Sequence, residues 1–174
     1  MSNTSAQLTY TAKTLEQVAF TMLEKFVKER FPGASMRNTM NKGSVSRSDV
    51  ADAVLTLGGR DYLIEIKAST KKPSSNLRFT HQTVTKAIGK DVIVALISQI
   101  ATGDPTFEFF RLSDVVDQMI IEPAFLIPKT RTKAQVQELG DILELPDAVL
   151  DVTRLLDSPV RDYTHLRGAG TGQS

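Results

Sequence analysis

Apolar residues recur at intervals of three and four positions in the first well-patterned stretch of the chain, residues 14–30. The stripe consists of Leu15, Val18, Ala19, Met22, Leu23, Phe26 and Val27. This spacing places all of them on one face of a helix. Thr14 followed by Gln17 is typical of a helix start, and Pro32 with Gly33 is typical of its end. Residues 14–30 are therefore predicted to form an amphipathic helix.

Apolar and polar residues alternate in VADAVLTLGGRDYLIEIKA, residues 50–68, on both sides of Gly58-Gly59. Two adjacent glycines suit the positive backbone angles of a two-residue hairpin turn. One face of this hairpin is apolar throughout: Ala53, Leu55, Leu57, Tyr62, Ile64 and Ile66. A strand over residues 34–41, with Met36 and Met40 on one face, is expected to precede it.

The opposite face of the predicted hairpin carries acidic and basic side chains. A two-residue turn places Asp52 directly opposite Glu65, with β-carbons about 5 Å apart. Lys67 lies two residues further along the same face. Asp49 is an alternative to Asp52, but the alternation places Asp49 on the other side of the strand. Asp52 is therefore preferred.

The rest of the chain predicts further elements of both kinds. Residues 69–79 are polar and basic, as in a loop, and Thr80–Lys90 can form a helix that ends at Gly89. Further expected elements are strands at VIVALISQI and at 107–112, a helix from Ser113, and helices at 132–145 and 147–157. This order indicates an α/β domain over residues 1–122, a helical C-terminal extension over 123–165 and a disordered tail over 166–174.

Composition excludes several kinds of chemistry. The chain has 174 residues, 41% of them hydrophobic and 24% charged, as in a soluble globular domain. It has no Cys and two His, His81 and His165, which excludes thiolate nucleophiles, Cys-ligated zinc and a three-His centre. A two-His ribonuclease is disfavoured because His165 lies in the expected tail. Neither a signal peptide nor a membrane span is evident, so a cytoplasmic protein is expected.

Basic and acidic residues are segregated along the chain, although the net charge is only +1. Residues 37–90 hold ten Lys and Arg against four acids, whereas 91–128 hold one base and six acids. Lys129, Arg131 and Lys133 form a second basic group. A basic face suits a polyanion, although a solvated surface of mixed charge is the commoner explanation of one charged run.

The chemistry of the hairpin face follows from the opposition of its two acids. Two opposed carboxylates repel each other unless a cation lies between them. Oxygen ligands without His or Cys suit Mg²⁺, which binds through one or two carboxylates and the phosphates of a substrate. A nearby lysine can orient or deprotonate a water. Asp52, Glu65 and Lys67 thus have the groups needed for metal-assisted phosphodiester hydrolysis.

At these residues the sequence resembles the PD-(D/E)XK nuclease superfamily, which includes restriction enzymes and Holliday-junction resolvases. Asp52 of VADAVL matches the first acid, and IEIKAS supplies Glu65 and Lys67 as E-x-K. The resemblance covers about residues 14–98 and implies a restriction-endonuclease-like α/β core with a mixed central sheet. It implies metal binding by Asp52, Glu65 and the carbonyl of Ile66, with Lys67 serving the water. It further suggests site roles for Glu16, on the first helix, and Gln82.

The expected function is that of a Mg²⁺-dependent endonuclease acting on double-stranded or branched DNA, with Mn²⁺ as a substitute metal and a homodimer as the assembly. Two alternatives stay open: a catalytically inactive nucleic-acid-binding or assembly module on the same fold, and a ribonuclease. The expected phosphate-binding residues are Lys71, Lys72, Arg78, Lys86, Lys129, Arg131 and Lys133.

Overall fold

The structure is a computed structural model that describes residues 11–40, 51–72, 77–119, 124–127 and 134–156. Its elements in chain order are α1 (Ala12–Arg30), β1 (Ser35–Asn38), β2 (Ala53–Leu57), β3 (Arg60–Ala68), β4 (Leu77–Thr80), α2 (His81–Ala87), β5 (Val92–Ser98), η3 (Ile100–Thr102), β6 (Thr106–Arg111), α3 (Leu112–Val115), η4 (Val116–Gln118), β7 (Ala124–Ile127), α5 (Leu139–Glu144) and α6 (Val152–Leu156). The expected tail over 166–174 lies outside the described residues.

Helix α1 confirms the first predicted element but begins earlier than expected. The hydroxyl of Thr11, not that of Thr14, caps the helix and accepts a hydrogen bond from the backbone N–H of Thr14 at 3.1 Å. Every member of the predicted apolar stripe is buried in, or packed against, one hydrophobic cluster. The apolar periodicity predicted this helix because one face of α1 packs against the sheet.

The hairpin register is the one that the two glycines predict. Gly58 and Gly59 have φ values of +62° and +78°, and the ladder pairs Leu57 with Arg60 through to Ala53 with Ile64. The expected strand before the hairpin is β1, which pairs antiparallel with β2. Asp52 itself lies one residue before β2 rather than within it.

The central sheet has five strands in the order β1-β2-β3-β5-β6. Strands β3 and β5 are parallel, whereas the other neighbouring pairs are antiparallel, so the sheet is mixed as expected. Every residue of β5 is buried, because this strand has neighbours on both sides and apolar layers on both faces. Strand β3 lies between β2 and β5, so it is also interior to the sheet. Buried charged residues on such a strand are unusual.

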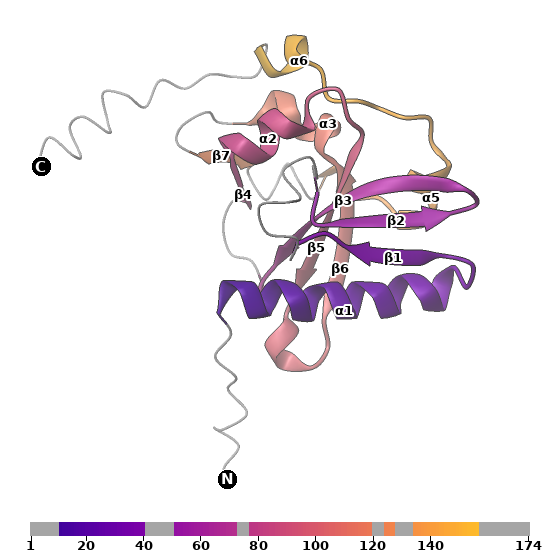
Figure 1. Ribbon diagram of the computed structural model, residues 1–174. Coiled ribbons are helices and arrows are strands. Elements are labelled where there is room, and N and C mark those ends of the chain that lie inside the picture. The colour runs from indigo at the N-terminus through magenta and orange to yellow at the C-terminus, as the bar shows by residue number, and fades with distance from the viewer. Residues whose placement is uncertain (1–10, 41–50, 73–76, 120–123, 128–133, 157–174) are drawn as a thin grey trace, which may run out of the picture.

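Two hydrophobic clusters cover the two faces of the sheet. The first cluster comprises Ala19, Phe20, Leu23, Val27, Ala34, Ala53, Leu55, Tyr62, Ile64, Ile66, Ile93, Ala95, Ile97, Ile100, Phe109, Leu139, Ile142 and Leu143. The second cluster comprises Leu77, Phe79, Val84, Ala87, Val92, Val94, Leu96, Phe110, Leu112, Val115, Val116, Met119 and Leu150. Figure 1 shows α1 below the sheet, with β4, β7, α2 and α3 above it.

A second, two-stranded sheet of β4 and β7 was not predicted. Strand β4 occupies the end of the segment 69–79 that was expected to be a loop, and it pairs antiparallel with β7. Helix α2 follows at once and is capped by Thr80, as expected, with Gly89 at a φ of +80° beyond its end. The small sheet thus lies over the face of the central sheet that carries Glu65 and Lys67.

The C-terminal helices are shorter than predicted. Within the described part of 132–145, which begins at residue 134, Ala134 and Leu139–Glu144 are helical, and within the described part of 147–157, which ends at residue 156, the helix is Val152–Leu156. The chain between them is extended and tied to the core. The Leu150 N–H donates to the carbonyl of Lys90 at 2.9 Å, and the Gly89 N–H donates to the carbonyl of Leu150 at 2.5 Å. Near Leu150 the backbone therefore makes hydrogen bonds to the core and not the hydrogen bonds of a helix.

Candidate functional site

Asp52 is held at the junction of three strands. Its backbone carbonyl accepts a hydrogen bond from the N–H of Thr39 at 2.9 Å, which continues the pairing beyond β1 and β2. Its carboxylate Oδ2 accepts the backbone N–H of Ile66 at 2.9 Å. The side chain of Asp52 thus reaches β3 at the residue between Glu65 and Lys67.

Glu65 and Lys67 lie on the same face of β3 because successive residues of a strand alternate between faces. Their partners in the parallel register are Val94 and Leu96, which belong to the second cluster. The Lys67 Nζ lies 3.8 Å from Oε2 of Glu65. An acid and a base are therefore set together on the face of the sheet that the second cluster covers.

Glu65 is among the most buried charged residues of the described chain, with 8% of its surface exposed. The pKa of Glu65 is raised from an ordinary 4.5 to about 8, first by burial and then by the negative charge of Asp52, while Lys67 opposes both effects. Burial also raises the pKa of Asp52, against the opposing effects of the Ile66 N–H and Lys67. Burial therefore disfavours the charge of both acids, and the charge of Asp52 further disfavours that of Glu65, at a site with one ammonium.

Glu16 on α1 belongs to the same electrostatic group. Its side chain is half-buried, and its pKa is raised by burial and then by the charge of Asp52, while Lys67 lowers it. Among the described residues, however, no three His, Cys, Asp or Glu side chains lie close enough together to hold a metal ion. Glu16 thus affects the charge of the site without forming a three-carboxylate ligand set.

The donor set nevertheless fits Mg²⁺. This ion keeps several of its waters and commonly takes only one or two protein carboxylates, with substrate phosphates in the remaining positions. Asp52 and Glu65 supply two such carboxylates in a site that carries more acid than base. Oxygen donors without His or Cys favour Mg²⁺ or Mn²⁺ over zinc.

Four of the remaining predicted site residues lie at the surface. Lys71 and Lys72 follow β3 and are exposed, as are Arg78 on β4 and Gln82 on α2. Lys86 on α2 is half-buried. The predicted phosphate contacts Lys129, Arg131 and Lys133, together with the alternative metal ligand Asp49, lie outside the described residues.

Sequence reasoning missed one residue of the site, Phe79. The Nζ of Lys67 lies 4.5 Å from the centre of the Phe79 ring, and Phe79 has no exposed surface. The segment 69–79 was expected to be a loop, so its last residue was not considered part of a strand. The alternation of Leu77, Arg78 and Phe79 was the available signal, but it spans too few residues to predict a strand alone.

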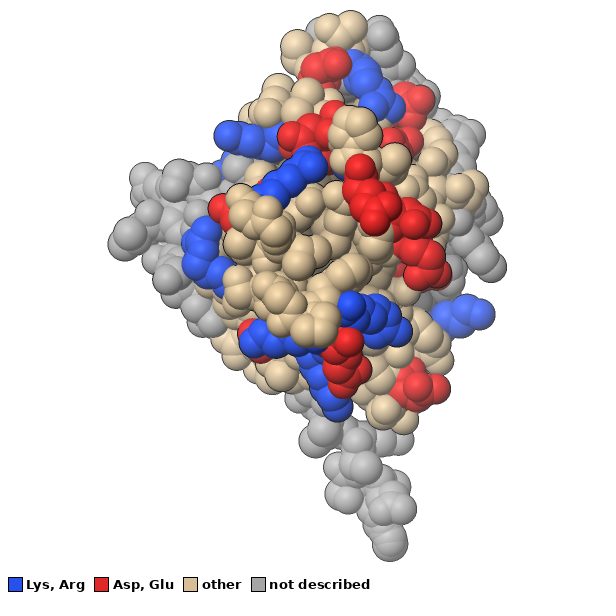
Figure 2. Space-filling model, turned by 90° about the vertical axis from the view of Figure 1, so that its right-hand side faces the viewer, with Lys and Arg blue, Asp and Glu red and all other residues tan. Residues whose placement is uncertain are grey.

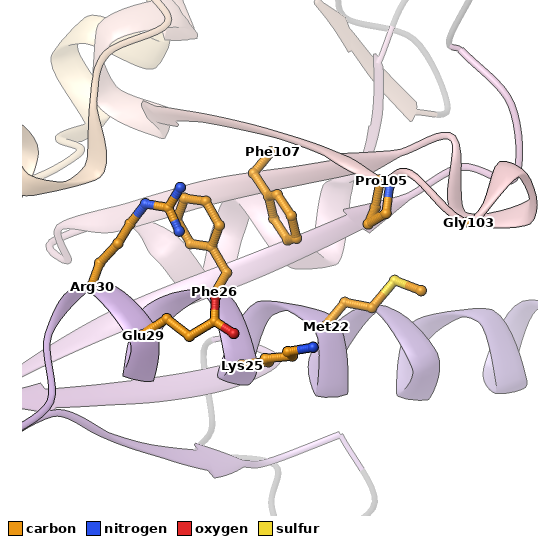
Figure 3. A pocket seen from close by; sticks show the side chains of 8 residues that line it. All are labelled: Met22, Lys25, Phe26, Glu29, Arg30, Gly103, Pro105 and Phe107. Carbon is orange, nitrogen blue, oxygen red and sulfur yellow. The ribbon is translucent and has the colours of Figure 1, made fainter.

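A groove of about 490 Å³ lies elsewhere, between the C-terminal half of α1 and the turn before β6. Its lining is Met22, Lys25, Phe26, Glu29, Arg30, Gly103, Pro105 and Phe107. The rings of Phe26 and Phe107 are stacked 4.3 Å apart, and the Arg30 guanidinium lies 3.6 Å from the centre of the Phe26 ring (Figure 3). None of these lining residues belongs to the carboxylate site, and Glu29 is the one acid among them.

The face of the molecule in Figure 2 carries both signs of charge. Lys and Arg alternate with Asp and Glu around an uncharged centre, and the acidic residues gather along one border. This face is therefore no single-sign surface for a polyanion. Across the parts of the chain that the structure describes, no helix is long and apolar enough to cross a membrane.

The observed elements define the class of fold. A helix, a three-stranded antiparallel meander, a second helix and a strand parallel to the last meander strand follow in the order expected of a restriction-endonuclease-like core. The expected fold class is confirmed, with β4 inserted before the second helix.

No protein-family model matches the sequence, and no curated protein matches it. Among solved structures, a similar chain is the Holliday junction resolvase Hjc of the archaeal hyperthermophile Archaeoglobus fulgidus. The two chains are 18% identical with a TM-score of 0.47, and the match covers 71% of this chain and 93% of the resolvase. We assign no residue role from this likeness.

Proposed function

We propose that the protein is a Mg²⁺-dependent nuclease that hydrolyses phosphodiester bonds of DNA. The observation that supports this most is the grouping of Asp52, just before β2, with Glu65 and Lys67 on β3. Asp52 contacts the backbone of β3, and Lys67 lies 3.8 Å from Glu65. Two acids with raised pKa values and one ammonium form a site that a divalent cation would stabilise.

Each side chain has a role in this proposal. Asp52 and Glu65 would hold the metal, and a bound Mg²⁺ supplies a more acidic water and neutralises charge on the phosphoryl group. Lys67 orients the attacking water through its ammonium. Glu16 adds negative charge nearby. The exposed cations Lys71, Lys72 and Arg78 would hold backbone phosphates, because they follow the site along the chain.

Cleavage of supercoiled plasmid and of branched DNA, with Mg²⁺ or with EDTA, tests the proposal. Cleavage with Mg²⁺ alone is expected, whereas an inactive binding module would bind DNA without cleaving it under either condition. Including RNA as a further substrate distinguishes a ribonuclease from the proposed deoxyribonuclease. If no substrate is cleaved with either Mg²⁺ or Mn²⁺, the proposal that the protein is a nuclease is refuted.

Lys67→Ala should lower the cleavage rate by roughly 10²- to 10⁴-fold, because it removes the group that serves the water. DNA affinity, measured with Ca²⁺ in place of Mg²⁺, should stay close to that of the parent. Lys28→Ala is the matched control, since Lys28 is an exposed lysine on α1 that pairs with Glu24 at 3.3 Å. Rates of the Lys67 variant equal to those of the control would remove Lys67 from the mechanism.

The two acids are expected to behave differently from Lys67. Glu65→Ala and Asp52→Asn should abolish metal binding as well as cleavage, because each removes a ligand charge. Asp49→Asn should be nearly silent, in line with the parity of the alternation before β2. A dead Asp49 variant beside an active Asp52 variant would reassign the first ligand while leaving the nuclease intact.

A further inference from the structure

The ammonium of Lys67 lies against the face of an aromatic ring. Its Nζ is 4.5 Å from the centre of Phe79, well inside the distance of about 6 Å at which cations are attracted to a ring face. Such contacts strengthen when water is excluded. Phe79 is fully buried, and only 25% of the Lys67 side chain is exposed.

The position of the Phe79 ring is fixed from several sides. Phe79 lies in β4, paired in register with β7, and belongs to the second hydrophobic cluster. The next residue, Thr80, caps α2 by accepting the N–H of Thr83 at 3.1 Å. A ring held between a strand ladder and a helix cap cannot move away from Lys67 without disturbing both elements.

The contact with Glu65 alone fixes the ammonium poorly. A lysine has a four-carbon stem with many rotamers, and its 3.8 Å separation from the Glu65 carboxylate is longer than an ordinary hydrogen bond. The ring of Phe79 adds a second, directional attraction. Together, the carboxylate and the ring restrict the ammonium to one region of the site.

We infer that Phe79 is a positioning residue that holds the Lys67 ammonium beside Glu65 through the negative face of its ring. The inference rests on the proposed nuclease function, in which Lys67 serves the attacking water. The cleavage rate then depends on the electrostatic character of the Phe79 ring, not only on the volume that the ring fills.

Fluorinated phenylalanines at position 79 separate these two roles. One, two and three fluorines preserve the ring's shape while progressively weakening its negative face. We expect kcat to fall stepwise, by roughly 5- to 30-fold in total, with KM unchanged. The same series at Phe110, which is fully buried in the same cluster, should leave kcat within about 2-fold and controls for packing. Equal rates throughout the Phe79 series would overturn the inference.

A background of Lys67→Ala sharpens the result. If Phe79 acts through Lys67, fluorination should have no effect on the residual rate of that variant. A persisting stepwise fall in the absence of the lysine would show that the ring acts on something else and would overturn the inference.

A magnetic resonance measurement on the metal-free protein reports the contact without any cleavage. The ring current of Phe79 should shift the Cε protons of Lys67 upfield, and Phe79→Leu should return them to ordinary values. Failure of the parent to cleave any substrate would refute the proposed function, and the ring-current shift would still decide whether Phe79 holds the ammonium. Unshifted Cε protons in the parent would overturn the inference.

Discussion

Two buried groups of charge lie on the same central sheet and differ in how they are balanced. One is the site around Glu65 and Lys67 on β3. The other is the pair of Asp91, just before β5, and Arg111, at the end of β6, with 3.3 Å between Oδ1 and Nε. Both Glu65 and Arg111 are almost fully buried, at 8% and 4% exposure.

The Asp91–Arg111 pair is compensated by its surroundings. A second nitrogen of Arg111 donates to the carbonyls of Ile142 at 3.3 Å and Leu145 at 3.4 Å, at the end of α5. Burial raises the pKa of Asp91, while Arg111 and a hydrogen bond with the backbone of Ala148 lower it. Arg111 and Arg60 thus oppose the effects of burial and of Asp114 on Asp91, and the Asp91–Arg111 pair joins the C-terminal segment to the sheet.

The group around Glu65 has no such balance. Burial raises the pKa values of Glu16, Asp52 and Glu65, the charge of Asp52 raises those of Glu16 and Glu65 further, and Lys67 is the ammonium that opposes these shifts. Evolution of a stable core alone would favour neutral residues here, because uncompensated buried charge is destabilising. We infer that the Asp91–Arg111 pair stabilises the fold, whereas the group around Glu65 is arranged for the cation of the proposed nuclease.

Breaking the balanced pair should have the largest effect on stability. Arg111→Ala leaves Asp91 without its buried partner and removes the two hydrogen bonds that Arg111 donates at the end of α5. The free energy of unfolding should therefore fall by about 3–5 kcal/mol. Urea denaturation measures it. Lys28→Ala is the control, since the ion pair of Lys28 with Glu24 is more exposed and should contribute about 1 kcal/mol or less. Equal losses would remove the distinction between buried and exposed pairs.

Neutralising Glu65 should raise the stability of the metal-free protein at high pH, whereas breaking the Asp91–Arg111 pair lowers it. The folded pKa of Glu65, about 8, exceeds its ordinary 4.5, so its contribution to stability is present below pH 4.5 and is lost as pH rises to 8. Without metal, Glu65→Gln should therefore be more stable than the parent at pH 8.5, by on the order of a few kcal/mol. At pH 4 the two should be similar. A variant less stable than the parent at both pH values would contradict the account.

Exposed cations should have the smallest effect. Removing Lys71 and Lys72 together should leave stability within about 0.5 kcal/mol and lower DNA affinity equally for all sequences. If both contact phosphates, the slope of log affinity against log salt should decrease by about 2. Fluorescence anisotropy over a range of salt measures this. An unchanged slope would remove these lysines from the DNA interface.

The parts of the fold that were predictable are those with local signals. The stripe of α1, the Gly58-Gly59 turn and the apolar run of β5 each specify structure within a few residues. The pairing of β4 with β7 joins segments about 45 residues apart, and each has only four residues. The C-terminal helices were overestimated because contacts to Gly89 and Lys90 hold the chain extended near Leu150.

In the candidate site, too, the features that depend on local spacing were predictable, and those that depend on distant elements were not. A two-residue turn fixes parity, so the approach of Asp52 to β3 and the shared face of Glu65 and Lys67 followed from spacing alone. The depth of Glu65 and its raised pKa depend on layers from distant elements. The contact of Phe79 with Lys67 depends on β4, which the sequence did not indicate.

Calorimetric titration of Mn²⁺ into the metal-free protein at pH 7 tests the central claim most directly. With a pKa of about 8, Glu65 is largely protonated at this pH, so binding of the metal should release a proton. The account predicts a binding heat that varies with the ionisation enthalpy of the buffer in the parent, and no binding in Glu65→Gln. Equal binding by both proteins, or none by the parent, would contradict it.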